Sequence, residues 1–121
     1  MSNAGTIVAI VTDLLFQSRL EAQARALGFE VTVVDAPEAV RPALAATAAL
    51  AVLDLHIAGI DWREAVALAQ ELGVPVLAFG RHTEPQLLRS AREAGCAKVV
   101  PRSTFVEALP QLIEELAGSR A

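Results

Sequence analysis

Residues 50–59, LAVLDLHIAG, decide the fold of this chain. Four apolar residues, 50–53, run without a break into a single carboxylate, Asp54, and then into a loop that contains Gly59. A short apolar run bounded by turn residues is typical of a strand buried on both faces, as in the centre of a parallel sheet. Open α/β sheets bind ligands at the carboxyl ends of their strands, so Asp54 is the first candidate for a functional residue.

The composition indicates a small acidic domain. A length of 121 residues predicts one domain, which we place at 6–117, between a disordered start or expression remnant at 1–5 and a frayed C-terminus at 118–121. The net charge of −4 argues against a nucleic-acid partner, and no apolar run is long enough for a membrane span. The single cysteine excludes an internal disulfide. These features predict a cytoplasmic location without nucleic-acid or membrane partners.

Strand-like and helix-like segments alternate five times along the chain. Strands are expected at 6–11, 30–34, 50–54, 74–79 and 98–100. Helices are expected at 14–27, after 35, at 61–72, at 83–94 and from 104 onward. Short connections between such segments predict parallel βαβ units with helices on both faces of the sheet.

Capping residues and prolines predict where the helices begin. Five polar residues are expected as helix N-caps: Asp13, Asp35, Asp61, Thr83 and Thr104. Pro42 falls inside the second helix, so that helix is expected to kink or to start late. Pro110 is expected to bend the last helix near its start.

The sequence resembles the CheY-like response-regulator receiver family from Thr6 to about Leu116. The resemblance rests on VLDL at 52–55 with Gly59 beyond it, VPVL at 74–77, and AGCA at 94–97. It implies a flavodoxin-like, doubly wound sheet of five parallel strands in the order 2-1-3-4-5, with helices on both faces. It also implies a functional edge at the carboxyl ends of the strands.

In receivers an aspartate that ends the third strand accepts a phosphoryl group, and the resemblance gives this role to Asp54. A carboxylate that attacks phosphorus needs a cation to neutralise the negative charge. The resemblance implies Mg²⁺ as this cation, with Asp13 and Asp54 as ligands, although the family's acid pair is reduced here to Thr12-Asp13. Asp13 is alternatively only the N-cap of the first helix.

Three other switch positions of the family differ in this chain. Gly80 stands where receivers have a hydroxyl, Val99 where they have an aromatic, and Arg102 where they have a lysine. Of the five switch positions, Asp54 alone is unaltered. We therefore interpret the chain as a degenerate pseudo-receiver, in which Arg102 holds Asp54 in a bidentate ion pair and phosphorylation does not cycle.

The leading hypothesis is a stand-alone receiver-like signalling domain that acts by protein–protein contact, with a histidine kinase or an output protein as partner and no required cofactor. An authentic phospho-accepting receiver in a two-component phosphorelay is an alternative. A sensor of a small anion or nucleotide, bound by a cationic rim of Arg81, His82 and Arg102, is another. The sequence contains no Ser-His-Asp set, metal-ligand cluster or Gly-rich phosphate loop, so we predict no enzymatic activity.

Two further expectations concern surfaces. The side chain of His56 is expected to point to solvent or to cover the pocket at Asp54. A homodimer is expected through the fourth helix, fifth strand and fifth helix. That face would draw on Leu87, Leu88, Arg92, Phe105, Val106, Leu109 and Leu112.

Overall fold

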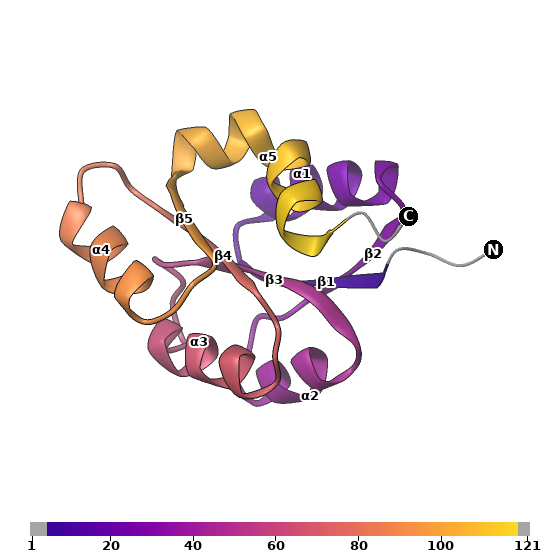
Figure 1. The fold of residues 1–121 in the computed structure, drawn as a ribbon, viewed down its shortest axis with the longest axis horizontal. Helices are drawn as coiled ribbons and strands as arrows, with labels where there is room; N and C mark the ends of the chain where they lie inside the picture. The colour runs from indigo at the N-terminus through magenta and orange to yellow at the C-terminus, as the bar shows by residue number, and fades with distance from the viewer. Residues whose placement is uncertain (1–4, 119–121) are drawn as a thin grey trace.

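The computed structural model describes residues 5–118, which form one five-stranded parallel sheet with helices on both faces (Figure 1). The strands are β1 (Gly5–Ile10), β2 (Phe29–Val33), β3 (Ala48–Asp54), β4 (Val76–Gly80) and β5 (Lys98–Pro101). Their order, β2-β1-β3-β4-β5, confirms the predicted fold class. The predicted disordered start and frayed end lie outside the described residues, except for Gly5, which begins β1, and Gly118, the C-cap of α5.

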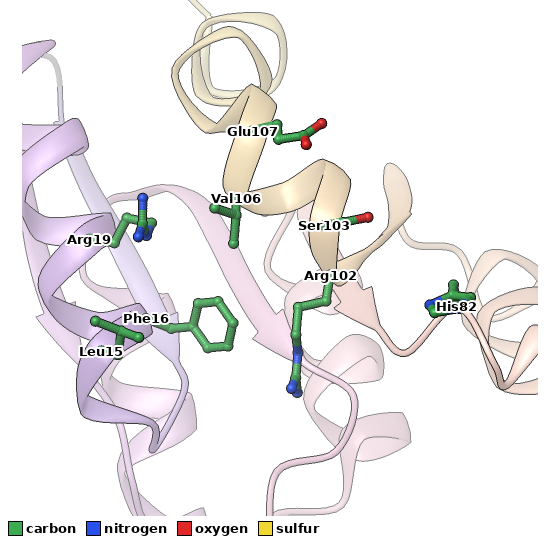
Figure 2. Close-up of a pocket in the computed structure, with 8 residues that line it drawn as sticks. All are labelled: Leu15, Phe16, Arg19, His82, Arg102, Ser103, Val106 and Glu107. Atoms are coloured by element: carbon green, nitrogen blue, oxygen red, sulfur yellow. The ribbon is translucent and has the colours of Figure 1, made fainter.

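The helices are α1 (Leu14–Ala26), α2 (Val40–Ala45), α3 (Trp62–Glu71), α4 (Pro85–Glu93) and α5 (Arg102–Ala117), with a 3₁₀ turn, η1 (Pro37–Ala39), before α2. Helices α1 and α5 cover one face of the sheet, and α2, α3 and α4 cover the other (Figure 1). Figure 2 shows the first turns of α1 and α5 side by side. No helix within residues 5–118 combines the length and apolar character that crossing a membrane requires.

The central strand is buried on both faces, as the apolar run predicts. Leu50 and Val52 pack with α1 and α5, whereas Ala51 and Leu53 pack with the helices on the other face. All four are at most 1% exposed. Because successive side chains of a strand point to opposite faces, this run joins two core layers. It also fixes Asp54 at the edge of the sheet.

Helix starts follow the predicted caps in part. The carboxylate of Asp61 accepts the main-chain N–H of Arg63 at 2.9 Å, which confirms its N-cap role. Helix α2 starts late, so that Pro42 lies in its first turn. Ala108 has non-helical angles (φ −113°, ψ 18°) inside α5, which confirms the predicted bend before Pro110.

Three predicted caps are wrong. Neither Asp35 nor Thr83 caps a helix, because Pro37 and Pro85 take the first positions of η1 and α4. Proline is favoured at the first helical position and keeps the preceding residue out of the helix, so each helix starts later than the cap pattern indicates. Helix α5 begins directly after β5, and Thr104 therefore lies inside its first turn.

Candidate functional site

Asp54 ends β3 at the carboxyl edge of the sheet, as predicted. It is 6% exposed and is the only charged residue among the buried residues of the described chain. Its Oδ1 accepts a hydrogen bond from the main-chain N–H of His56 at 2.9 Å. A buried carboxylate requires such donors, because burial of an unpaired charge is costly. The loop that follows β3 therefore holds the carboxylate through its own backbone.

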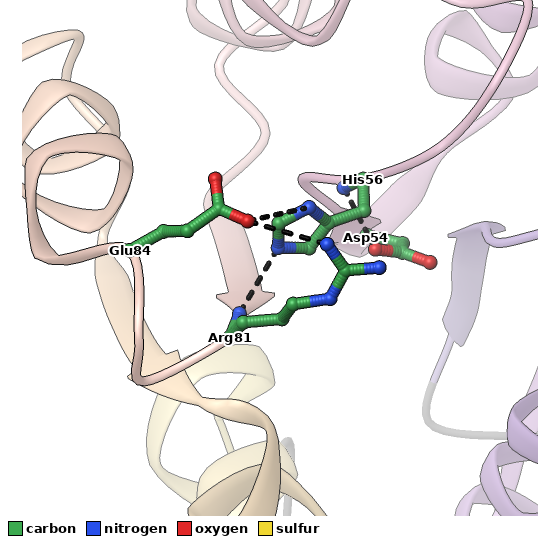
Figure 3. A network of polar contacts seen from close by, with 4 residues as sticks. All are labelled: Asp54, His56, Arg81 and Glu84. Atoms are coloured by element: carbon green, nitrogen blue, oxygen red, sulfur yellow. Dashed lines mark hydrogen bonds and ion pairs between the residues drawn. The ribbon is translucent and has the colours of Figure 1, made fainter.

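The imidazole of His56 connects this loop to the loop that follows β4 (Figure 3). Its Nε2 accepts the main-chain N–H of Arg81 at 3.0 Å, and its Nδ1 lies 3.9 Å from a carboxylate oxygen of Glu84. The guanidinium of Arg81 lies 3.2 Å from the same oxygen. An imidazole nitrogen that accepts a hydrogen bond carries no proton, so this arrangement assigns the proton to Nδ1, which faces Glu84. We call Asp54, His56, Arg81 and Glu84 together the His56 bridge.

Of the two alternatives for the His56 side chain, the one in which it points to solvent is wrong, and the one in which it covers the pocket stays a prediction. The side chain is only 14% exposed and is engaged between two loops. Its acceptor role depends on a main-chain N–H that lies 25 positions further along the chain. Because every residue except proline has such an N–H, no local motif signals this contact.

Gly80, the last residue of β4, packs against the His56 bridge. A Cβ at this position would lie 3.3 Å from Nε2 of His56, 3.1 Å from Cδ2 of Leu88 and 3.4 Å from Cδ1 of Leu55. The contacts at 3.1 and 3.3 Å would be tighter than almost all contacts that a real Cβ makes, so Leu88 and His56 would have to move by a few tenths of an ångström. The glycine leaves the space that the imidazole occupies. A serine or threonine here would have to displace His56 or Leu88.

Asp13 is the N-cap of α1. Its Oδ1 accepts the main-chain N–H groups of Leu15 at 2.9 Å and Phe16 at 3.2 Å, which confirms the N-cap interpretation. Within residues 5–118, no group of three or more His, Cys, Asp or Glu side chains is placed to hold a metal ion. Mg²⁺ is usually held by one or two carboxylates together with water, and Asp13 and Asp54 stay a prediction as its ligands.

The guanidinium of Arg102 packs on an aromatic ring and does not pair with Asp54. Its Cζ lies 5.2 Å from the centroid of the Phe16 ring, within the range of a cation–π contact. No hydrogen bond or ion pair joins Arg102 to Asp54 in the described part of the chain. The predicted carboxylate–guanidinium pair is therefore wrong. The Nε of Arg102 is buried and has no hydrogen-bond acceptor among residues 5–118.

A cavity of about 500 Å³ opens between the first turns of α1 and α5 (Figure 2). Leu15, Phe16 and Val106 supply its apolar lining, and its charged or polar lining includes Arg19, His82, Arg102 and Glu107. Two predicted rim residues, His82 and Arg102, thus lie at one cavity. The third, Arg81, belongs to the His56 bridge. The contribution of α1 to the cavity is not predicted from the sequence.

No protein-family model matches the sequence, and no curated protein matches it. Solved structures do match. Full-length FixJ from B. japonicum is 24% identical, with a TM-score of 0.80 over 95% of this chain, which spans 58% of the FixJ chain. The receiver domain of sensor histidine kinase PA1611 from Pseudomonas aeruginosa, a structure with magnesium coordinated in its active-site cleft, is 20% identical, with a TM-score of 0.77 over 97% of this chain and 98% of that one.

The phosphorylated cyanobacterial phytochrome response regulator RcpA is 14% identical, with a TM-score of 0.80 over 100% of this chain and 98% of that one. The fold is that of a response-regulator receiver domain. Identities of this size establish the fold of the chain, and its chemistry has to be argued from its own residues.

Gly80, Val99 and Arg102, which differ from the residues of the receiver family, lie in three different surroundings. Gly80 contacts the His56 bridge, whereas Val99 on β5 is 6% exposed and belongs to the core cluster that contains Leu88 and Ala91 of α4. The smaller side chain of Val99 is therefore accommodated by packing beneath α4. Arg102 lies at the α1–α5 cavity.

The receiver face formed by α4, β5 and α5 offers few of its predicted apolar residues to a partner. Four of them are buried in the core: Leu88, Phe105, Leu109 and Leu112. Leu87 and Val106 are half-buried, and Arg92 is exposed. The most exposed large apolar residues of the described chain lie elsewhere, on the first turn of α1, where Leu14 is 75% and Leu15 is 68% exposed.

Proposed function

We propose that this chain is a pseudo-receiver domain in cytoplasmic signalling, which acts by contact with a protein partner and not through phosphorylation of Asp54. The observation that carries this proposal is the His56 bridge. The imidazole of His56 packs beside Gly80, where receivers place a hydroxyl, and connects the two loops at the Asp54 edge. A switch that depends on the movement of a hydroxyl has no group to move here. We propose no enzymatic activity and no required cofactor.

The surroundings of Asp54 also support this proposal. A phosphoryl group adds charge and three oxygens that require donors. Gly80 has no side-chain donor, and the guanidinium of Arg102 contacts Phe16. The N–H of His56 already donates to Oδ1 of Asp54. Asp13 and Asp54 would hold Mg²⁺, and the positive charge of the ion would offset part of this addition.

Intact mass spectrometry tests the proposal directly. The protein and an Asp54→Asn control are incubated with acetyl phosphate and Mg²⁺. We expect both masses to be unchanged. A gain of about 80 Da, the mass of a phosphoryl group, in the wild type alone would overturn the proposal. Arg102→Lys and Gly80→Ser variants restore the family residues, and a gain in either one alone would identify the altered position that limits phosphorylation.

An authentic phospho-accepting receiver in a phosphorelay is the second candidate. One observation favours it. Of the two carboxylate oxygens of Asp54, only Oδ1 accepts a hydrogen bond from residues 5–118, so Oδ2 is available for attack on phosphorus. The same mass measurement separates the two candidates. A phosphoryl gain that also shifts the NMR signals of the 81–84 loop would support a working switch.

For the partner we propose a histidine kinase or an output protein, and for self-association the face formed by α4, β5 and α5. The exposed Arg92 and the half-buried Leu87 are the residues of this face available for contact, since Val106 is directed toward α1. Analytical ultracentrifugation tests the homodimer. A Leu87→Glu variant should shift the protein toward the monomer, while a strict monomer at high concentration in the wild type would exclude the dimer.

A further inference from the structure

The cavity between α1 and α5 has the size and lining of a small-molecule site. Its volume of about 500 Å³ lies within the usual range of about 300–1,000 Å³ for such sites. We propose that it binds a small amphipathic carboxylate. The apolar body of this ligand contacts Phe16 and Val106, and its carboxylate accepts hydrogen bonds from Arg102. This site is independent of the signalling role and of the state of Asp54.

The apolar half of the site lies between the two helices. Figure 2 shows the ring of Phe16 and the side chain of Val106 directed into the space between α1 and α5. Leu15 extends this surface and is 68% exposed, and its neighbour Leu14 is 75% exposed. Large apolar side chains exposed together mark binding surfaces, because the fold gains nothing by leaving them in water.

The cationic half of the site has unused hydrogen-bonding capacity. Within residues 5–118 the Arg102 guanidinium donates no hydrogen bond, although it is held in place on the Phe16 ring, and its Nε is buried. No acidic side chain in residues 5–118 pairs with Arg102, Arg19 or His82, all of which line the cavity. A guanidinium presents its N–H groups as a planar fork that matches a carboxylate. Nε itself is inaccessible, so a ligand carboxylate would accept from the terminal Nη groups, for which residues 5–118 supply no acceptor.

Two further features select a single negative charge. Helix α5 has Pro101 at its N-cap and no side-chain cap, so its first turn presents uncapped N–H groups and the positive end of the helix dipole. Glu107 also lines the cavity, and in Figure 2 it is directed away from the guanidinium of Arg102. Its charge opposes polyanions such as nucleotides, whereas one carboxylate can be placed at Arg102. The charge distribution and the apolar lining together favour a monocarboxylate with an aliphatic or aryl body.

Titration of the full chain with octanoate, followed by ¹H–¹⁵N NMR, tests the site. We expect saturable shifts centred on the amides of Leu15, Ser103 and Val106, which line the cavity. Octanol and inorganic phosphate are the matched probes, since each supplies only one half of the ligand. Octanol that binds as tightly as octanoate would reduce the site to an apolar docking surface and overturn the proposal. Phosphate that binds equally tightly would overturn it by removing the apolar half.

Variants separate the specific contribution of Arg102 to ligand binding from general effects of charge. Arg102→Met should weaken octanoate binding by at least about tenfold, which corresponds to about 1.4 kcal/mol. The matched control is Arg25→Met, on the last turn of α1 and outside the cavity, which should leave binding unchanged. Val106→Glu places a negative charge in the apolar lining and should abolish binding. The site would be refuted if Arg102→Met and Arg25→Met bound octanoate with equal affinity, or if Val106→Glu still bound it. Thermal unfolding checks that each variant is folded.

Discussion

We predict that Gly80 is required because neighbouring side chains leave no room for a larger residue, and not because its backbone conformation excludes one. Gly80 is not among the glycines with positive φ, so alanine fits its backbone and should stabilise the protein by about 0.4–1 kcal/mol through the unfolded chain. The added methyl group, however, would lie 3.1 Å from Leu88 and 3.3 Å from His56. Overpacking of this kind costs about 1–3 kcal/mol. Gly80→Ala should therefore lower the free energy of unfolding by about 1 kcal/mol.

A double-mutant cycle isolates the part of this cost that comes from the imidazole. His56→Ala removes one of the short contacts, so Gly80→Ala should be less costly in that background. We expect a coupling energy of about 1 kcal/mol, within the range for residues in contact. Urea unfolding followed by the fluorescence of Trp62, the single tryptophan, measures all four proteins.

The control cycle pairs Gly80→Ala with His82→Ala. His82 is an exposed histidine in the same loop and is not part of the His56 bridge. These two changes should be additive within about 0.5 kcal/mol. If the Gly80–His56 cycle were additive to the same degree, the imidazole would not limit the space at Gly80, and the proposed role of the His56 bridge would fail.

Three other measurements test the remaining contacts. Asp13→Ala should lower the free energy of unfolding by about 1 kcal/mol through loss of the α1 cap, whereas Ser18→Ala on the exposed side of the same helix should change it little. Burial raises the pKa of the Cys96 thiol from its usual 9.0 to about 11, so iodoacetamide should label the folded protein slowly at pH 8. The thiol of the unfolded chain ionises at lower pH, so the free energy of unfolding should fall as the pH rises from 9.0 to 11. Arg41→Ala should cost less than about 1 kcal/mol in urea unfolding and less still at high salt, because the Arg41–Glu71 pair is more than half exposed at both side chains.

The sequence predicts burial more accurately than it predicts where each strand ends. The apolar pattern places Val11 and Val34 inside strands, whereas the structure ends β1 and β2 one residue earlier. Both residues are nevertheless 1% exposed. Apolar character determines whether a side chain enters the core, but the end of a strand depends on main-chain pairing with a neighbour that the local sequence does not specify. The number and order of the strands could therefore be predicted, but their exact ends could not.

The sequence predicts which residues of the candidate site lie at the sheet edge, because topology determines their positions. It does not predict which partner a long side chain contacts. Asp54 lies at the predicted edge because the carboxyl end of a central parallel strand can lie nowhere else. Arg102 lies near that edge as well, but its long side chain had two partners within reach. Pairing with Asp54 is the obvious choice from charge alone. The ring of Phe16, which belongs to the buried stripe of α1, is the partner in the structure.

The energetics of Arg102 explain why the α1–α5 side of the Asp54 edge differs from the His56 side. A cation–π contact with Phe16 contributes about 0.5–2 kcal/mol. A buried donor without an acceptor, such as Nε of Arg102, costs about 1–3 kcal/mol. These two terms are of similar size, so the protein alone gains little by placing the guanidinium there. Nε is inaccessible, so an anion would instead pair with the terminal N–H groups of this guanidinium, which have no acceptor within residues 5–118. The side with His56, Arg81 and Glu84, in contrast, already has its hydrogen bonds formed.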